Sequence, residues 1–213
     1  MSEETTKQRI LRVAGELFAA KGYAATGVAE LCEAANIGKG ALYHHIKSKE
    51  DLLYQISKRH VEEPLEVAEA LIDMELPADE KLRRLSRYQM KTIADHLPEI
   101  TVYFRDGHHL DGEYRTKLEG LRARWERVWA VVLRQGVDQG IFRSADPISV
   151  KGLLGIFNYS WVWLDPDGLL PHEEIADQLA DIALWGQLVN TRDRAVPASK
   201  ATSPAPVALS LSP

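Results

Sequence analysis

The sequence predicts an all-α protein of about nine helices, with an N-terminal three-helix unit and a larger C-terminal helical part. Three observations lead to this prediction. Apolar residues recur at helical spacing along most of the 213 residues. No segment shows a convincing alternation of apolar and polar residues, as a half-buried strand would. Residues that commonly start or stop helices, such as Ser48 and Gly140, separate the apolar stripes.

The first helix is expected at 6–21, where Gly22 closes it. Its apolar face would be formed by Ile10, Val13, Ala14, Leu17 and Phe18. A second helix at 27–35 and a third at 39–46 are separated by a turn at 36–38. Thr26 is expected to cap the second helix through a first-turn N–H. Ser48 and Asp51 have capping-box spacing, which predicts a fourth helix that continues past Pro64 with a kink.

Five further helices are expected after Pro77. They are predicted at 79–96, from 98 onward, at 111–139, at 146–164 and at 171–189. Asp146 and Pro147 provide the N-cap and the first-turn proline of the eighth helix. The domains are expected at 1–56 and 57–192. The remaining segment, 193–213, is rich in Pro, Ala, Ser and Thr and is expected to be disordered.

Composition excludes several classes of protein. Hydrophobic residues at 45% and charged residues at 27% are typical of a globular protein. The only cysteine, Cys32, rules out internal disulfides and thiolate zinc clusters. No apolar run has transmembrane length and the first residues are unlike a signal peptide, so we expect a cytoplasmic protein that does not use a membrane.

A net charge of −5, taken alone, argues against a nucleic-acid-binding protein, but the distribution of charge is uneven. Residues 1–58 contain eight Lys or Arg and seven Asp or Glu. From 36 to 49 there are three lysines and no acidic residue. The acidic surplus therefore lies towards the C-terminus, away from this segment.

The segment 36–52 carries the strongest functional signal. It predicts a short basic helix that bears an exposed aromatic residue and rests on an apolar support, as the DNA major groove requires. We interpret it as the recognition helix of a helix-turn-helix that binds double-stranded DNA. The residues expected to face base edges are Lys39, Gly40, Ala41 and His44. Tyr43 and Lys49 are expected to contact phosphates, Lys49 with help from the start of the fourth helix.

Residues 6–56 resemble the DNA-binding region of TetR-family transcriptional regulators. The resemblance is carried by Lys21-Gly22-Tyr23, by Thr26, and by the spacing Leu-Tyr-x-His-x-x-x-Lys-x-x-Leu that begins at Leu42. It implies that His45 contacts a phosphate and that Thr26 belongs to the same DNA-binding set. Gly27 and Gly38 stand where the family usually has a hydroxyl cap. The expected function is a dimeric repressor that a small-molecule effector releases from a palindromic operator.

Polar residues interrupt the apolar faces of several C-terminal helices, which predicts a ligand cavity. Arg122 lies on the same face as Trp125 and Trp129, where it would either pair with a buried carboxylate or meet an anionic ligand. The complete set of expected ligand-binding residues is Gln89, His96, Tyr103, Phe104, Arg122, Trp125, Trp129 and Asn158.

The eighth helix is apolar on nearly every side, and the ninth carries small residues that allow close approach. Both are therefore expected to pack against their symmetry mates in a homodimer, which also matches the TetR family. The stretch 157–168 resembles a branch that senses acyl-CoA thioesters in lipid or steroid breakdown. In that branch an arginine near Trp163 often meets the CoA phosphates, and here Arg122 or Arg105 would supply the charge.

A helical metal-dependent enzyme is the alternative. Asp106, His108, His109 and Asp111 place two carboxylates and two imidazoles within six residues, and such groups can bind a divalent ion. Gly107 and Gly112 make the segment a loop, where polar residues are common for reasons of turn geometry. We therefore expect a protein that is not an enzyme and that needs neither a metal nor a cofactor.

Overall fold

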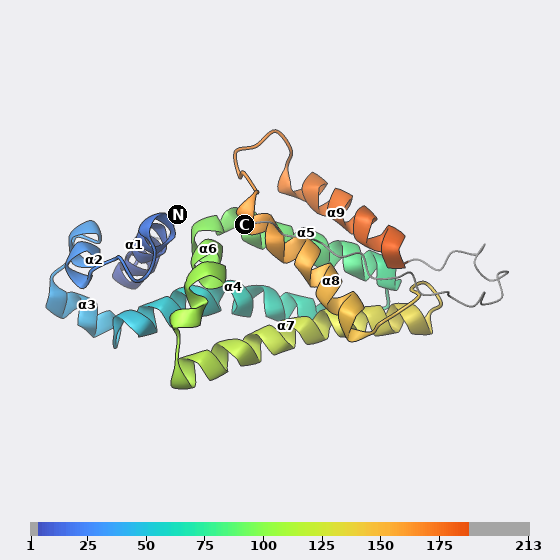
Figure 1. The fold of residues 1–213 in the computed structure, drawn as a ribbon, viewed down its shortest axis with the longest axis horizontal. Coiled ribbons are helices and arrows are strands. Elements are labelled where there is room, and N and C mark those ends of the chain that lie inside the picture. The colour runs from blue at the N-terminus through green and yellow to red at the C-terminus, as the bar shows by residue number, and fades with distance from the viewer. Residues whose placement is uncertain (1–3, 188–213) are drawn as a thin grey trace, which may run out of the picture.

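The computed structural model describes residues 4–187, whose regular elements are nine α-helices and two short 3-10 helices (Figure 1). No strand is assigned within this range, which confirms the predicted all-α fold. The expected tail at 193–213 and the last residues of the predicted ninth helix lie outside the described residues. None of the described helices is long and apolar enough to cross a membrane.

Three helices form the N-terminal end of the molecule (Figure 1). They are α1 (Thr6–Lys21), α2 (Val28–Ala34) and α3 (Lys39–His45). Thr5 begins α1 with a capping box, because its hydroxyl accepts from the Gln8 N–H and the Gln8 side chain accepts from the Thr5 N–H. Phe18 of α1 and Leu42 of α3 are fully buried and belong to the same hydrophobic core as the buried residues of the C-terminal helices.

Helix α4 (Lys49–Ile72) belongs to both halves of the molecule. It begins beside α3, runs towards the centre and packs along α7 (Figure 1). Pro64 lies inside this helix without ending it. The expected domain boundary at 56 therefore falls within a continuous helix and not in a linker.

The start of α4 differs in detail from the expected capping box. The Ser48 hydroxyl accepts from the Asp51 N–H at 3.0 Å, as predicted. The Asp51 carboxylate, however, accepts from the N–H of Lys47 at 2.8 Å and not from that of Ser48. This bond fixes Lys47, the residue before the Ser48 cap. The second bond of a capping box, from the Ser48 N–H to the Asp51 carboxylate, is not formed.

The C-terminal part contains α5 (Ala78–Asp95), α6 (Leu97–Asp106), α7 (Gly112–Asp138), α8 (Pro147–Asn158) and α9 (His172–Gln187). In Figure 1, α6 stands between the N-terminal helices and the group formed by α5, α8 and α9. Helices α4 and α7 run side by side in the lower part of the view. The 3-10 helix η1 (Gly107–His109) joins α6 to α7.

The predicted eighth helix is too long by six residues. Helix α8 ends at Asn158, and the chain tightens into the 3-10 helix η2 (Tyr159–Val162). The Ser160 hydroxyl donates to the Phe157 carbonyl, and the Ser160 carbonyl accepts from the N–H groups of Trp163 and Leu164. These local bonds replace the helical ladder and turn the chain towards α9.

Candidate functional site

The surface of α3 fits the expected recognition helix. Leu42 is completely buried and anchors the helix, whereas Tyr43 is 44% exposed. The neighbouring residues Lys39, Gly40, Ala41 and His44 are exposed, and His45 is half-buried. No acidic residue lies on α3. Insertion into the major groove requires a helix whose inner face is apolar and whose outer face is basic and exposed to solvent.

Thr26 is placed differently from the expectation. Its side chain is 1% exposed, and its hydroxyl donates to the Gly22 carbonyl at 2.9 Å. It therefore forms no side-chain cap on α2 and is not presented to a DNA backbone. Neither Gly27 nor Gly38 provides a side-chain cap, as the sequence predicted.

Lys49 is the first residue of α4, where the helix N-terminus favours an anion. Its Nζ lies 4.3 Å from the centre of the Tyr23 ring. Burial lowers the pKa of Lys49, and the nearby charge of Asp106 acts in the opposite direction. The ammonium group thus rests on an aromatic ring at the start of α4.

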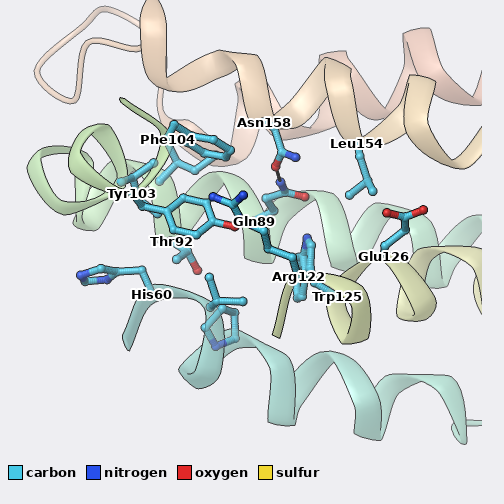
Figure 2. Close-up of a pocket in the computed structure, with 14 residues that line it drawn as sticks. His60, Gln89, Thr92, Tyr103, Phe104, Arg122, Trp125, Glu126, Leu154 and Asn158 are labelled. Atoms are coloured by element: carbon cyan, nitrogen blue, oxygen red, sulfur yellow. Dashed lines mark hydrogen bonds between the residues drawn. The ribbon is translucent and has the colours of Figure 1, made fainter. Parts of the chain in front are cut away.

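A second site is a cavity of about 330 Å³ in the C-terminal part (Figure 2). Helices α4, α5, α6, α7 and α8 all contribute to its lining. The lining residues are His60, Val61, Pro64, Gln89, Thr92, Ile93, Ile100, Tyr103, Phe104, Arg122, Trp125, Glu126, Leu154 and Asn158. This mixture of an apolar wall with a few convergent polar groups is typical of small-molecule sites.

Arg122 is the cationic residue of this lining, and it is an exposed residue. Its Nε donates to the Tyr103 hydroxyl at 2.8 Å, and the guanidinium lies 4.6 Å from the Tyr103 ring centre. Burial raises the pKa of Tyr103, so the phenol stays protonated at neutral pH. None of the ion pairs formed within residues 4–187 includes Arg122. The buried carboxylate partner that the sequence allowed is therefore absent from the described residues.

Gln89 and Asn158 form the other polar pair of the cavity. The Gln89 amide nitrogen donates to the Asn158 side-chain oxygen, a bond drawn in Figure 2. The Gln89 side-chain oxygen is buried and has no hydrogen-bond partner within the described part of the chain. An orphaned acceptor beside a cavity is available to a donor on a ligand.

Six of the eight expected ligand-binding residues meet at this cavity, and two do not. Trp129 is only 1% exposed and packs against Phe157, with ring centres 5.2 Å apart. His96 lies outside the lining and faces His60 at 4.5 Å between ring centres. The sequence prediction missed His60, which α4 contributes to the lining.

The end of α6 is bonded directly to the end of α1. Arg105 donates to the carbonyls of Phe18 and Ala19, the latter at 2.9 Å. It also forms an ion pair with Asp106, which in turn accepts from the Tyr23 N–H at 3.2 Å. A helix that lines the cavity is therefore fastened to the N-terminal end of the molecule, which carries α3.

The residues of the alternative metal site do not come together. Asp106 is 5% exposed and is engaged by Arg105 and Tyr23, whereas the Asp111 side chain is 84% exposed and pairs with Arg115. Among the described residues, no group of metal-ligating side chains includes this segment.

Helices α8 and α9 expose several large apolar side chains. Ile148 is 78% exposed on α8, and Ile182 and Trp185 are 63% and 84% exposed on α9. Tyr159, which follows α8, is 63% exposed. Such a concentration of apolar surface commonly marks a protein interface.

Two family models match this chain. The model described as "Bacterial regulatory proteins, tetR family" covers residues 10–56. The model described as "Tetracyclin repressor-like, C-terminal domain" covers residues 75–187, which is more than half of the chain. The chain belongs to the TetR family of transcriptional regulators. It is a DNA-binding regulator and not an enzyme, so the alternative of a metal-dependent enzyme is not supported.

Comparison with individual proteins agrees with this assignment. The chain is 28% identical over 184 residues to the transcriptional repressor KstR2 of Rhodococcus jostii, covering 84% of this chain and 90% of the relative. It is 35% identical to the solved TetR regulator PfmR from Thermus thermophilus, with a TM-score of 0.78 over 84% of this chain and 98% of PfmR.

A third similar protein has been solved with its ligands. AibR, in complex with isovaleryl coenzyme A and operator DNA, is 26% identical to this chain with a TM-score of 0.74. The alignment covers 84% of this chain and 97% of AibR.

Proposed function

We propose that this protein is a repressor that binds a two-fold symmetric operator as a homodimer and leaves it when an anionic amphipathic ligand fills the C-terminal cavity. The observation that carries the ligand class is Arg122, a cation that lines an otherwise largely apolar cavity and has a phenol, not a carboxylate, as its partner. An acyl-CoA thioester or a related carboxylated catabolite has the matching chemistry.

The DNA-binding part of the proposal rests on the solvent-exposed face of α3, which carries no acidic residue. Lys39, Gly40, Ala41 and His44 would meet base edges, while Tyr43, His45 and Lys49 would contact phosphates. A dimer formed through α8 and α9 would present two copies of α3 to half-sites about one helical turn apart, or a multiple of that spacing. The exposed apolar residues of α8 and α9 support this arrangement.

The size of the cavity limits how a ligand would lie. A volume of about 330 Å³ is near the lower end of the roughly 300–1,000 Å³ that small-molecule sites occupy. We infer that the acyl portion would lie against Phe104 and Trp125 and that the charged portion would lie at Arg122. The nucleotide of a CoA thioester would extend outside the cavity. AibR, with its bound isovaleryl coenzyme A, supports this class of ligand.

Ligand binding would change the affinity for DNA through a movement of α6. A ligand anion at Arg122 competes with the Tyr103 hydroxyl, and Tyr103 is on α6. Since Arg105 fastens the same helix to the end of α1, a shift of α6 would alter the position of α3. Couplings between two such sites are typically about 1–3 kcal/mol, which changes DNA affinity about 5- to 150-fold.

The test begins with operator DNA selected by the purified protein from random genomic fragments. Release of this DNA is then measured by fluorescence anisotropy with isovaleryl-CoA, longer acyl-CoA thioesters, the corresponding free acids and CoA alone. We expect Arg122→Met to retain operator affinity and to lose release by the active ligand. Tryptophan emission should respond to ligand in the original chain, because Trp125 lines the cavity.

Arg127→Met is the matched control, because Arg127 is an exposed arginine on α7 that is not part of the cavity lining. It should bind and release DNA like the original protein. If Arg122→Met releases DNA at the same ligand concentration as the original, the arginine has no role in ligand recognition. If no acyl-CoA or carboxylate releases the DNA, the proposed ligand class is wrong.

A further inference from the structure

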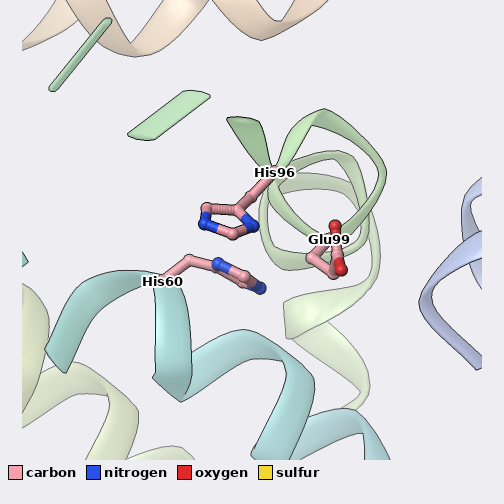
Figure 3. A group of neighbouring side chains, drawn as sticks. All are labelled: His60, His96 and Glu99. Atoms are coloured by element: carbon pink, nitrogen blue, oxygen red, sulfur yellow. The ribbon is translucent and has the colours of Figure 1, made fainter. Parts of the chain in front are cut away.

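Three side chains with metal-ligating atoms meet away from the ligand cavity's centre and from the DNA-facing surface (Figure 3). His60 comes from α4, His96 from the junction between α5 and α6, and Glu99 from the first turn of α6. One ligand atom from each residue lies within 4.8 Å of the others. In Figure 3 the two imidazole rings face each other and the carboxylate lies beside them.

His60 is the residue that makes this cluster unusual. Its side chain is 5% exposed, and Nδ1 is buried without a hydrogen-bond partner among residues 4–187. A buried polar atom without a partner is costly, and a bound ion is one of its ordinary explanations.

Glu99 supplies the negative charge. It is half-buried. None of the ion pairs formed within the described part of the chain includes it, and the nearby Arg59 is paired with Glu63 at 2.8 Å. The carboxylate is therefore open to a cation supplied from solution.

An ion has a route to the cluster. His60, His96 and Glu99 line a cleft together with residues of α1 and α4, including Arg12 and Gln55, and with Asp95 at the end of α5. This cleft is distinct from the ligand cavity, although His60 borders both.

We propose that His60, His96 and Glu99 form a binding site for a divalent transition-metal ion, with Zn²⁺ as the best match. Two imidazole nitrogens and one carboxylate oxygen are a ligand set that Zn²⁺ uses at about 2.0–2.2 Å, with a fourth position left open. Here the open position would face the cleft. Mg²⁺ and Ca²⁺ prefer sites made of oxygen atoms and match this set poorly.

The site needs only side-chain movement to close on an ion. Ligand atoms around a tetrahedral Zn²⁺ lie roughly 3.4 Å apart, so the present spacing of up to 4.8 Å must shorten. His96 and Glu99 are half-buried and border the open cleft, which allows their side chains to adjust.

The position of the site gives the ion a structural consequence. It would join α4 to the first turn of α6, and Glu99 also packs against α1. A Cβ built on Gly15 of α1 would lie 2.9 Å from Glu99 Cγ, so this contact depends on glycine. Occupancy would thus fix the relative positions of α1, α4 and α6, which in the proposed function link the cavity to the DNA-facing end.

The experiment uses the untagged full chain, freed of metal with a chelator and dialysed. Co²⁺ is titrated while the visible absorption is recorded, and Zn²⁺ is then added in competition. We expect a four-coordinate Co²⁺ spectrum that saturates near one ion per chain, its loss on adding Zn²⁺, and a higher thermal midpoint with Zn²⁺ but not with Mg²⁺. His96→Ala and Glu99→Gln should lose the spectrum and the thermal shift.

His108→Ala is the control, because it removes an exposed histidine that is outside the cluster. It should keep both signals. Should the cluster variants fail to fold, histidine NMR signals of the original chain decide the matter: Zn²⁺ should shift those of His60 and His96 and leave the other five in place. Absence of the Co²⁺ spectrum, or its loss in His108→Ala alone, would overturn the proposal. These readouts contain no DNA, so their failure leaves the proposed repressor function intact.

Discussion

The positions of Lys49 and Lys39 predict two different kinds of DNA contact. Its ammonium group rests 4.3 Å from the Tyr23 ring at the start of α4, where a phosphate would be favoured by both the lysine and the helix N-terminus. Lys39, by contrast, is exposed on the first turn of α3 and has the position of a base-reading residue.

We predict that Lys49→Ala weakens binding to operator and unrelated DNA by a similar factor. The slope of log affinity against log salt should fall by about one unit, because one phosphate contact is lost. The measurement is fluorescence anisotropy at several KCl concentrations. Lys151→Ala is the control, since Lys151 lies on α8 and pairs with Glu126. A changed sequence preference with an unchanged salt slope would show that Lys49 reads bases.

Residues of the candidate cavity were predictable in part. Gln89, Tyr103 and Arg122 were found because polar groups interrupt apolar stripes, and all three line the cavity. The same argument wrongly included Trp129. A stripe shows which residues face inward, but it does not distinguish a filled core from an open space. The sequence did not identify His60 as a cavity residue. One continuous buried face runs along α4, and nothing in the sequence distinguishes the helical turn at His60, which borders the cavity, from the turns that pack in the core.

At the scale of helices, the sequence located the elements more securely than their ends. The predicted and observed limits of α1 coincide at Thr6 and Lys21, since a threonine cap and a glycine stop flank an apolar stripe. The end of α8 was predicted six residues too late. Its apolar residues continue through η2, and hydrophobic spacing does not report the Ser160 hydrogen bonds that tighten the chain there.

The end of α7 depends on a close contact that substitution can test. A Cβ on Gly136 would lie 2.0 Å from the Phe142 ring, which folds back over the helix after Gly140. Gly136→Ala should lower the free energy of unfolding by about 1–3 kcal/mol, as overpacked cores do. Chemical denaturation followed by circular dichroism measures this change.

Gly120→Ala provides the comparison on the same helix, because no atom lies within 4 Å of its added Cβ. It should stabilise the protein by about 0.5–1 kcal/mol through helix propensity. Equal effects of the two substitutions would mean that Phe142 moves aside without cost.

At the scale of the whole molecule, the apolar surface of α8 and α9 makes the proposed dimer testable. Ile182 is 63% exposed on α9, whereas Leu179 is partly buried against the core. A charge at Ile182 therefore tests association with less risk to folding. We predict that Ile182→Glu sediments as a folded monomer at micromolar concentration, while the original chain sediments as a dimer.

Val67→Glu is the control, since Val67 is an exposed apolar residue on α4, a helix that is not part of the proposed interface. It should remain a dimer. A dimer that survives Ile182→Glu would place the interface elsewhere, and a monomeric original chain would remove the interface altogether.

The continuity of α4 restricts how this protein could be taken apart or recombined. Its 24 residues form a rod about 36 Å long, and Leu52, Leu53 and Ile56 near its start are almost completely buried. Cutting after residue 56 would sever the rod and expose apolar faces that the C-terminal helices cover. A chimera that borrows the DNA specificity of this protein therefore has to exchange α4 as a whole, or graft only the exposed residues of α3 onto another member of the family.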